Sequence, residues 1–344
     1  MIKEGINKVI RGINLSSEEA GAVMRQVMSG EATDAQIGSF LTGLRMKGET
    51  PEEIFGCAQV MRDLSFQINT GHAVVVDTCG TGGDGTGTFN ISTTVAFVVA
   101  GVGIAVAKHG NRSVSSKSGS ADVLKALGVN IDLRPIEVEQ VLNKIGLGFL
   151  YAPIFHQAMK YAVGPRKEIG IRSVFNILGP LTNPARTRYQ VVGVYDGTLT
   201  EPLALVLGRL GVEGACVVHG YGGLDEVSPV GPTKITHLCQ GSINTFYINP
   251  EDFGFPRRQM KHLKGEDPIY NGEITKKVLQ GEKGPCRETV LLNAGVAFFA
   301  SEVVGSIQEG VKLAAYSIDS GKALEKLSRL IKVTNEGFDE EGIQ

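Results

Sequence analysis

Two successive strand–loop–helix patterns between Asp77 and Ser120 constrain the fold of this chain more than any other part of its sequence. In the first pattern, the apolar run 74–77 predicts a buried strand and leads into a loop with five glycines between Gly80 and Gly87. The sequence NIST at 90–93 then offers a Ser or Thr N-cap for an apolar helix that continues to about Ala100.

The second pattern repeats this arrangement with a strand expected over 104–108, a polar loop over 109–119 and a helix over 121–127. Both loops therefore present backbone N–H groups at helix N-termini, which is an arrangement that binds anions. The glycines let the oxygens of such an anion approach the backbone closely. The second loop adds two lysines, one arginine, one histidine and five serines within residues 108–122. These donors exceed the needs of one phosphate, so we expect a ligand with several phosphates, or with a phosphate and a pyrophosphate.

The glycine loop matches neither of the two common nucleotide-binding patterns. No Gly-Lys-Ser/Thr follows at Walker A spacing, and the loop is not a GxGxxG that opens directly into a helix. For a lone glycine-rich loop, a sharp strand-to-helix turn without any ligand is an equally good interpretation. The second, donor-rich loop favours the ligand.

From residue 74 onward strands alternate with helices, which is typical of a mostly parallel sheet covered on both faces. Further strands are expected over 148–151, 190–195, 215–219, 234–239 and 245–248, and two C-terminal helices over 288–299 and 308–331. Ligands of such sheets bind beyond the carboxyl ends of the strands. The two loops should therefore share one mouth.

Residues 1–70 show helical periodicity, with caps at Ser16, Thr33 and Thr50. Short helices rarely stand alone, and the apolar face that includes Ile37 and Phe40 has little local sheet to cover it. We therefore expect a homodimer through this region.

The expected organisation is a small N-terminal α-helical domain and a large α/β domain. The ranges are 1–70 for the small domain and 73–331 for the large one, with a crossover segment at about 155–185 and a polar, flexible tail at 335–344.

Composition excludes several classes of protein. The net charge of −2 provides no basic surface for nucleic acid, and five scattered cysteines without CxxC spacing argue against a disulfide framework and a zinc site. The N-terminus has no signal-peptide pattern, and the longest apolar run, 95–107, is too short to cross a membrane. We expect a cytoplasmic protein with neither a membrane nor a nucleic-acid partner.

Several blocks of the sequence resemble the anthranilate phosphoribosyltransferase family. They are GTGGD (80–84), NIST (90–93) and KHGNRSVSSKSGSAD (108–122), with further matches at 32–50, 164–185 and 219–229. The resemblance runs from near residue 1 to about residue 330. It implies a fold of the nucleoside phosphorylase/phosphoribosyltransferase type and a dimer interface on the small domain. It also implies transfer of a phosphoribosyl group from phosphoribosyl pyrophosphate (PRPP) to anthranilate, the second step of tryptophan biosynthesis from chorismate.

The resemblance assigns PRPP binding to both loops. The implied contact residues are Gly80, Gly82, Gly83, Asp84, Thr88, Asn90, Ile91, Ser92, Thr93, Lys108, His109, Gly110, Asn111, Arg112, Ser113, Ser115, Ser116 and Ser120. No residue is implied as a covalent nucleophile or a general base, since the demand is for stabilising the charge of the leaving pyrophosphate.

Asp225 and Glu226 are adjacent carboxylates after an expected strand. Acidic pairs in loops are often merely solvated, but two hard oxygen ligands beside a polyphosphate suit Mg²⁺. The resemblance implies that both residues and the hydroxyl of Ser92 bind Mg²⁺. The family often has Asp where this chain has Gly222, which leaves the shape of this loop open.

For the acceptor, the resemblance implies that Gly80, Asn111 and Arg166 contact anthranilate, with His109 nearby. A lone histidine is more often structural, and Arg166, in an expected turn at 164–167, could instead form a surface ion pair with Glu168.

Two rival functions remain at this stage. A pyrimidine nucleoside phosphorylase shares the architecture, but the HGNRSVSS loop and the Arg166 segment favour the anthranilate enzyme. A non-catalytic, nucleic-acid-binding homologue should show a basic surface and degraded motifs, and this sequence shows neither.

Overall fold

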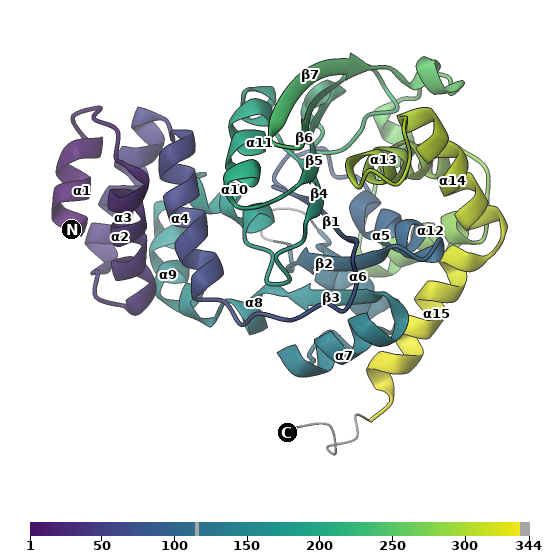
Figure 1. Ribbon diagram of the computed structural model, residues 1–344, viewed down its shortest axis with the longest axis horizontal. Helices are drawn as coiled ribbons and strands as arrows, with labels where there is room; N and C mark the ends of the chain where they lie inside the picture. Colours follow the sequence, from purple (N-terminus) through teal and green to yellow (C-terminus); the bar gives the residue numbers. More distant parts are fainter. Residues whose placement is uncertain (114–116, 338–344) are drawn as a thin grey trace.

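The computed structural model describes residues 1–113 and 117–337 (Figure 1). Ser115 and Ser116, which were expected to bind PRPP, lie outside the described residues, and so does most of the expected tail. The tail cannot begin at residue 335, because the last helix ends at Asn335.

The chain begins with four helices, which Figure 1 shows in purple at one end of the molecule. They are α1 (Ile2–Val9), α2 (Ser17–Ser29), α3 (Asp34–Lys47) and α4 (Pro51–Asp63). Ser16, Thr33 and Thr50 are the N-caps of α2, α3 and α4, and each forms a capping box. The three predicted caps are thus confirmed.

The remainder of the chain builds a sheet with the order β3-β2-β1-β4-β5-β6-β7. Its strands are β1 (Val75–Gly80), β2 (Ala105–Gly110), β3 (Leu147–Tyr151), β4 (Tyr189–Gly193), β5 (Gly214–Gly220), β6 (Thr233–Cys239) and β7 (Ser242–Ile248). Strands β1 to β5 pair in parallel, whereas β6 and β7 are antiparallel additions at one edge. The predicted mostly parallel sheet is confirmed.

Helices cover both faces of this sheet. They are α5 (Ile91–Gly101), α6 (Ser120–Ala126), α7 (Pro135–Ile145), α11 (Thr200–Arg209), α12 (Pro268–Leu279), α13 (Pro285–Ala300), α14 (Ile307–Asp319) and α15 (Lys322–Asn335). Alternate residues of β5 enter two different cores, as a strand buried on both faces requires. Cys216 and Val218 join the core under α5 and α13, whereas Ala215 and Val217 join the core under α11, which also contains the N-terminal helices.

The segment between β3 and β4 leaves the sheet and returns to the N-terminal helices (Figure 1). It forms α8 (Ala152–Phe155), α9 (Lys160–Ile169) and α10 (Val174–Leu181). Helix α9 packs against α2 and α3, and α10 packs against α4. The expected turn at 164–167 is wrong, since Arg166 lies inside α9, near its C-terminal end.

Two further expectations at helix ends are wrong. The single helix expected over 308–331 is split into α14 and α15, because Gly321 adopts a left-handed φ of 76° between them. The N-cap of α5 is Asn90 rather than Ser92 or Thr93, and its side chain makes no capping hydrogen bond. Within the described residues, no helix is long and apolar enough to cross a membrane.

Candidate active site

The two loops predicted to bind the anion lie at the same edge of the sheet, which we call the mouth. They do so because β1 and β2 are neighbouring parallel strands. Lys108, at the end of β2, is buried, and its Nζ donates to the carbonyl of Thr78 and to Ser92 Oγ at 3.3 Å. Asn90 Nδ2 donates to the carbonyl of Ser118, and Ser118 Oγ donates to Asn90 Oδ1, both at 3.2 Å. Asn90 therefore ties the loops together instead of capping its own helix.

A third loop, after β5, brings both predicted metal-binding carboxylates to this mouth. Gly82 N donates to Asp225 Oδ2 at 2.8 Å, and Ser92 N donates to Glu226 Oε1 at 3.0 Å. Burial raises the pKa of Asp225, with a further rise from the Asp84 carboxylate. Burial likewise raises the pKa of Glu226, with a further rise from Asp225.

The donor set in this loop fits a magnesium ion. Neither Asp225 nor Glu226 forms an ion pair with any lysine or arginine that the structure describes. Within residues 1–113 and 117–337, no three His, Cys, Asp or Glu side chains converge into a closed metal cage. A pair of carboxylates without a closed cage suits Mg²⁺, because this ion usually takes one or two carboxylates and fills its remaining positions with water and substrate phosphates.

Two glycines shape this site: Gly80 lets the carboxylate loop approach closely, and Gly222 supplies a turn in that loop. A Cβ on Gly80 would lie 2.5 Å from Asp225 Oδ2, so a larger residue there would displace the carboxylate. Gly222, where the family often has Asp, lies in the short 3₁₀ helix η3 (Tyr221–Gly223) with φ of 80°. Glycine adopts this left-handed backbone without steric cost, so the departure at this position preserves the turn.

The polar loop after β2 is folded by its own side chains. Asn111 Oδ1 accepts from Arg112 N at 2.7 Å, and Ser120 Oγ donates to the carbonyl of Asn111 at 3.2 Å. Arg112 Nε donates to the hydroxyl of Tyr151 at 2.9 Å, and Ser113 N donates to Asp122 at 3.2 Å. The Arg112 guanidinium is exposed, and its Nη1 lies 3.9 Å from Asp122 Oδ1.

Some predicted contact residues can serve a ligand only through their backbone. Ile91 and Thr93 are each 1% exposed, and Ile91 belongs to the core beneath α5. The Asp84 carboxylate already accepts a hydrogen bond from Thr86 Oγ1 at 2.6 Å within the glycine loop. Thr88 forms an antiparallel bridge with Lys264.

His109 is buried, and only one of its two ring nitrogens has a hydrogen-bond partner among the described residues. Its Nδ1 lies 3.1 Å from the carbonyl of Gly179, and its ring centroid is 5.1 Å from that of His156. Burial lowers the pKa of His109 to about 3 and that of His156 to about 4, so both rings are neutral at pH 7. The Nε2 atoms of both are buried and have no hydrogen-bond partner in the described part of the chain.

Arg166 is half-buried on α9, and burial lowers its pKa. Its guanidinium lies over the ring of Phe175, 4.9 Å from the centroid. The alternative ion pair with Glu168 is absent, and Arg166 has no carboxylate partner among the residues described. No hydrogen bond, ion pair or ring contact links the Arg166 side chain to the described residues of either loop.

Arg172 has a position at the site that the sequence reasoning missed. Its Nη2 donates to the carbonyl of Gly83, and its guanidinium stacks 4.1 Å from the ring centroid of Tyr195. It therefore connects the segment between α9 and α10 to the glycine loop. It belongs to the block 164–185 that resembles the family, which was the one signal available.

Asp77 was also missed as a positioning residue. It is buried at the end of the predicted strand, and its carboxylate accepts from His109 N at 3.2 Å and from Asn183 Nδ2 at 2.7 Å. Asn183 Nδ2 also donates to the carbonyl of Ala107 at 2.8 Å. Burial raises the pKa of Asp77 to about 6. This buried pair fixes the return of the crossover segment against β1 and β2.

Comparison with family models places this architecture among glycosyl transferases. Residues 3–65 match the helical bundle domain of the glycosyl transferase family, and residues 72–324 match its a/b domain.

Curated relatives cover nearly the whole chain. The anthranilate phosphoribosyltransferase of Acetivibrio thermocellus is 52% identical over 97% of this chain and 97% of its own length. The enzyme of the same name from Moorella thermoacetica is 55% identical over 96% of this chain and 98% of its own length.

Solved structures agree with these relatives. The anthranilate phosphoribosyltransferase of Thermus thermophilus superposes with a TM-score of 0.92 at 40% identity, covering 96% of this chain and 99% of its own. The enzyme from Saccharomyces cerevisiae in complex with PRPP and Mg has a TM-score of 0.89 at 30% identity, with 97% of each chain covered. The chain therefore belongs to the anthranilate phosphoribosyltransferase family.

Proposed function

We propose that this chain transfers the 5-phosphoribosyl group of PRPP to the amine of anthranilate, releasing pyrophosphate, as a step of tryptophan biosynthesis. The observation that carries the proposal is the meeting of three loops. The buried Lys108 ammonium contacts Ser92, and Glu226 accepts from Ser92 N, so a cation, a helix N-terminus and a carboxylate pair face one mouth. This set suits a substrate with several phosphates.

The loops after β1 and β2 bind PRPP, and their N–H groups and Lys108 stabilise the charge that develops on the departing pyrophosphate. Asp225, Glu226 and the Ser92 hydroxyl would hold Mg²⁺, which when bound supplies further charge neutralisation for the leaving group. The C1–O bond breaks as pyrophosphate leaves, and the anthranilate nitrogen then bonds to C1 and loses a proton. Positioning of the two substrates is sufficient for this step without a covalent nucleophile.

Anthranilate binds near Gly80, His109 and Asn111, with its carboxylate toward Arg166. A half-buried guanidinium without an anionic partner is a site for a carboxylate, which it can bind through two parallel hydrogen bonds. The neutral His109 ring has a buried Nε2 without a hydrogen-bond partner among the described residues, which a ligand reaching it could satisfy. Movement of α9 toward the loops would bring Arg166 to the acceptor and exclude water from the activated sugar.

Three further features belong to this proposal. The chain forms a homodimer through the helical domain of residues 1–70, it acts in the cytoplasm, and the large domain spans 73–331. The face with Ile37 and Phe40, expected to need a partner, is instead buried within the chain, so the support for the dimer comes from the exposed apolar side chains Ile10, Ile13 and Met46.

The test is the loss of anthranilate fluorescence in the presence of the purified chain. We expect consumption only when PRPP and Mg²⁺ are both present, with release of one pyrophosphate per anthranilate consumed. Consumption without PRPP, or phosphate-dependent cleavage of a pyrimidine nucleoside instead, would overturn the proposal.

A further inference from the structure

A cavity of about 410 Å³ shares no lining residue with the reaction loops. It lies between helix α12, the start of α13 and the segment that runs from the short 3₁₀ helix η5 (Met260–Leu263) to Glu266. Its volume falls within the range of pockets that hold small organic ligands. Nothing in the proposed reaction uses it.

Positive charge dominates this cavity. The charged side chains that line it are the cations Lys261, Lys264, Lys277, Lys283 and Arg287 and the carboxylates Glu266 and Glu282. Arg287 is neutralised by Asp319, with two N–O distances of 2.8 Å, and Lys283 lies 3.5 Å from the same carboxylate. Lys261, Lys264 and Lys277 form no ion pair or side-chain hydrogen bond with any residue described. These three lysines are exposed and line one cavity, and their like charges would attract a bound anion.

The cavity also offers apolar surface, from Tyr270, Ile274, Val278 and Pro285. A ligand that satisfies both features carries its charge at one end and an apolar or aromatic body at the other. Several ammonium groups favour a dianionic phosphate over a singly charged carboxylate. We propose that this cavity binds a small phosphate ester with an apolar or aromatic body, and that its occupancy is coupled to the PRPP loop.

The coupling has a backbone route. Phe89 N donates to the carbonyl of Leu263 at 2.9 Å, and Gly265 N donates to the carbonyl of Gly87 at 2.8 Å. The cavity wall and the end of the glycine loop are thus paired like two strands. A ligand that shifts the wall must act on the loop that precedes α5.

A side-chain route runs in parallel through Asn271 of α12, which is 2% exposed. Its Nδ2 donates to Asn90 Oδ1 at 3.0 Å, and its Oδ1 accepts from Glu266 N at 2.9 Å. Asn90 in turn ties the two PRPP loops together. The Asn271 side chain therefore connects Glu266 in the cavity wall to Asn90 at the reaction site.

The experiment is calorimetric titration of phenyl phosphate into the protein with PRPP and Mg²⁺ at saturation, so that the reaction site is filled. Lys277→Gln should weaken binding at least fivefold, and Lys261→Gln with Lys277→Gln at least tenfold. Lys276→Gln is the matched control, because Lys276 is the neighbouring lysine, does not line the cavity and pairs with Glu273 at 3.0 Å. It should change the affinity less than twofold. Equal weakening by Lys276→Gln, or no binding of phenyl phosphate either with or without PRPP, would overturn the site.

Two other probes test the ligand class. Inorganic phosphate should bind at least tenfold more weakly than phenyl phosphate, and benzoate should also bind more weakly. Inorganic phosphate or benzoate binding as tightly as phenyl phosphate would overturn the class proposed.

The coupling requires that phenyl phosphate and PRPP change each other's dissociation constants by the same factor, at least twofold, in the wild type and not in the double variant. Identical PRPP affinity with and without phenyl phosphate would overturn it. This part rests on the proposed function. PRPP binding is therefore titrated first, and its failure would count against that function, while the Lys277 and Lys276 variants still test the cavity.

Discussion

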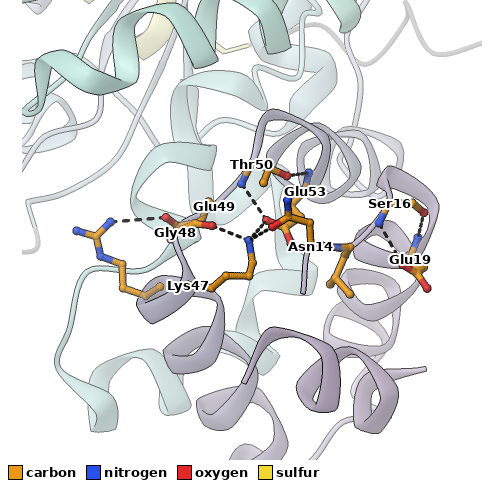
Figure 2. A network of polar contacts seen from close by, with 10 residues as sticks. Asn14, Ser16, Glu19, Lys47, Gly48, Glu49, Thr50 and Glu53 are labelled. Atoms are coloured by element: carbon orange, nitrogen blue, oxygen red, sulfur yellow. Dashed lines mark hydrogen bonds and ion pairs between the residues drawn. The ribbon is translucent and has the colours of Figure 1, made fainter. Parts of the chain in front are cut away.

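Two carboxylate sites in this molecule use the same kind of side chain in opposite ways. In the helical domain, Glu53 is fully buried and accepts hydrogen bonds from Leu15 N at 2.9 Å, Thr50 N at 2.8 Å and Lys47 Nζ at 2.9 Å (Figure 2). At the mouth of the sheet, Asp225 and Glu226 accept from backbone N–H groups but form no ion pair with a described residue. The first carboxylate is satisfied by the protein itself. The other two retain oxygens for a ligand from outside.

Structural and functional carboxylates in this fold differ in whether the protein itself pairs their charge. A buried charge is costly unless it is paired and hydrogen-bonded. Glu53 meets that condition through a lysine from α3 and two backbone groups, and thereby holds three segments together. Asp225 and Glu226 accept backbone hydrogen bonds but form no ion pair with a described residue, so we expect a bound cation to complete their pairing. Removing the charge of Glu53 should therefore reduce stability, and removing the charges of Asp225 and Glu226 should reduce catalysis.

The largest effect is expected from Asp225→Asn combined with Glu226→Gln. We expect turnover to fall about 10²-fold or more, with a higher Mg²⁺ requirement, because a preorganised stabiliser of the leaving group is lost. Steady-state rates across a Mg²⁺ titration measure this. The melting temperature should stay the same or rise, since two like charges no longer repel. Wild-type turnover with wild-type Mg²⁺ dependence would remove these carboxylates from the metal role.

Glu53→Gln should show the reverse pattern. The amide keeps the shape but leaves the Lys47 ammonium, 5% exposed, without its anion, and we expect a loss of about 2 kcal/mol in unfolding free energy. Urea denaturation followed by circular dichroism gives this value. Rates at 25 °C should remain within about twofold of wild type. A large catalytic loss without a loss of stability would contradict the assignment of Glu53 as structural.

The same comparison applies to two cations. Lys47 is paired with the Glu53 carboxylate, whereas Arg166 has no carboxylate partner among the described residues. Arg166→Ala should raise the KM for anthranilate about tenfold or more, the scale of one lost charge-assisted hydrogen bond, and leave the KM for PRPP within twofold. Initial-rate kinetics with each substrate varied in turn will separate the two. Equal rises in both constants would mean that Arg166 supports the whole site rather than the acceptor.

The smallest expected effect comes from Arg172→Gln, which removes the link from Arg172 to the carbonyl of Gly83 and the stacking on Tyr195. The glycine loop should then be less ordered, raising the KM for PRPP about threefold with the KM for anthranilate unchanged. Arg172→Lys, which keeps the charge but loses the planar stack, should recover only part of the affinity. Full recovery by lysine would show that charge alone matters.

The sequence predicted the parts of this site that depend on local pattern. Glycines after an apolar run and a donor-rich loop after the next strand placed the two loops together, because neighbouring parallel strands end at the same edge. Capping boxes at Ser16, Thr33 and Thr50 follow from four-residue motifs, and the structure contains all three.

Contacts between distant segments were beyond that reasoning. Arg172 reaches a loop 89 positions away, and Asp77 meets Asn183 from the far end of the crossover segment. Asn90 was expected to precede a Ser or Thr cap, but its side chain bonds Ser118 and Asn271 instead. In each case a tertiary hydrogen bond replaces the local one, and no short motif encodes it.

The central claim is that Asp225 and Glu226 are kept open for a metal ion that accompanies PRPP. The most direct measurement is the anomalous scattering of Mn²⁺ in crystals grown with PRPP, since Mn²⁺ prefers the same oxygen ligands. The account predicts a peak within about 2.3 Å of an oxygen of Asp225 or Glu226, and none beside Glu53. A peak bound only to phosphate oxygens, with both carboxylates unligated, would contradict it.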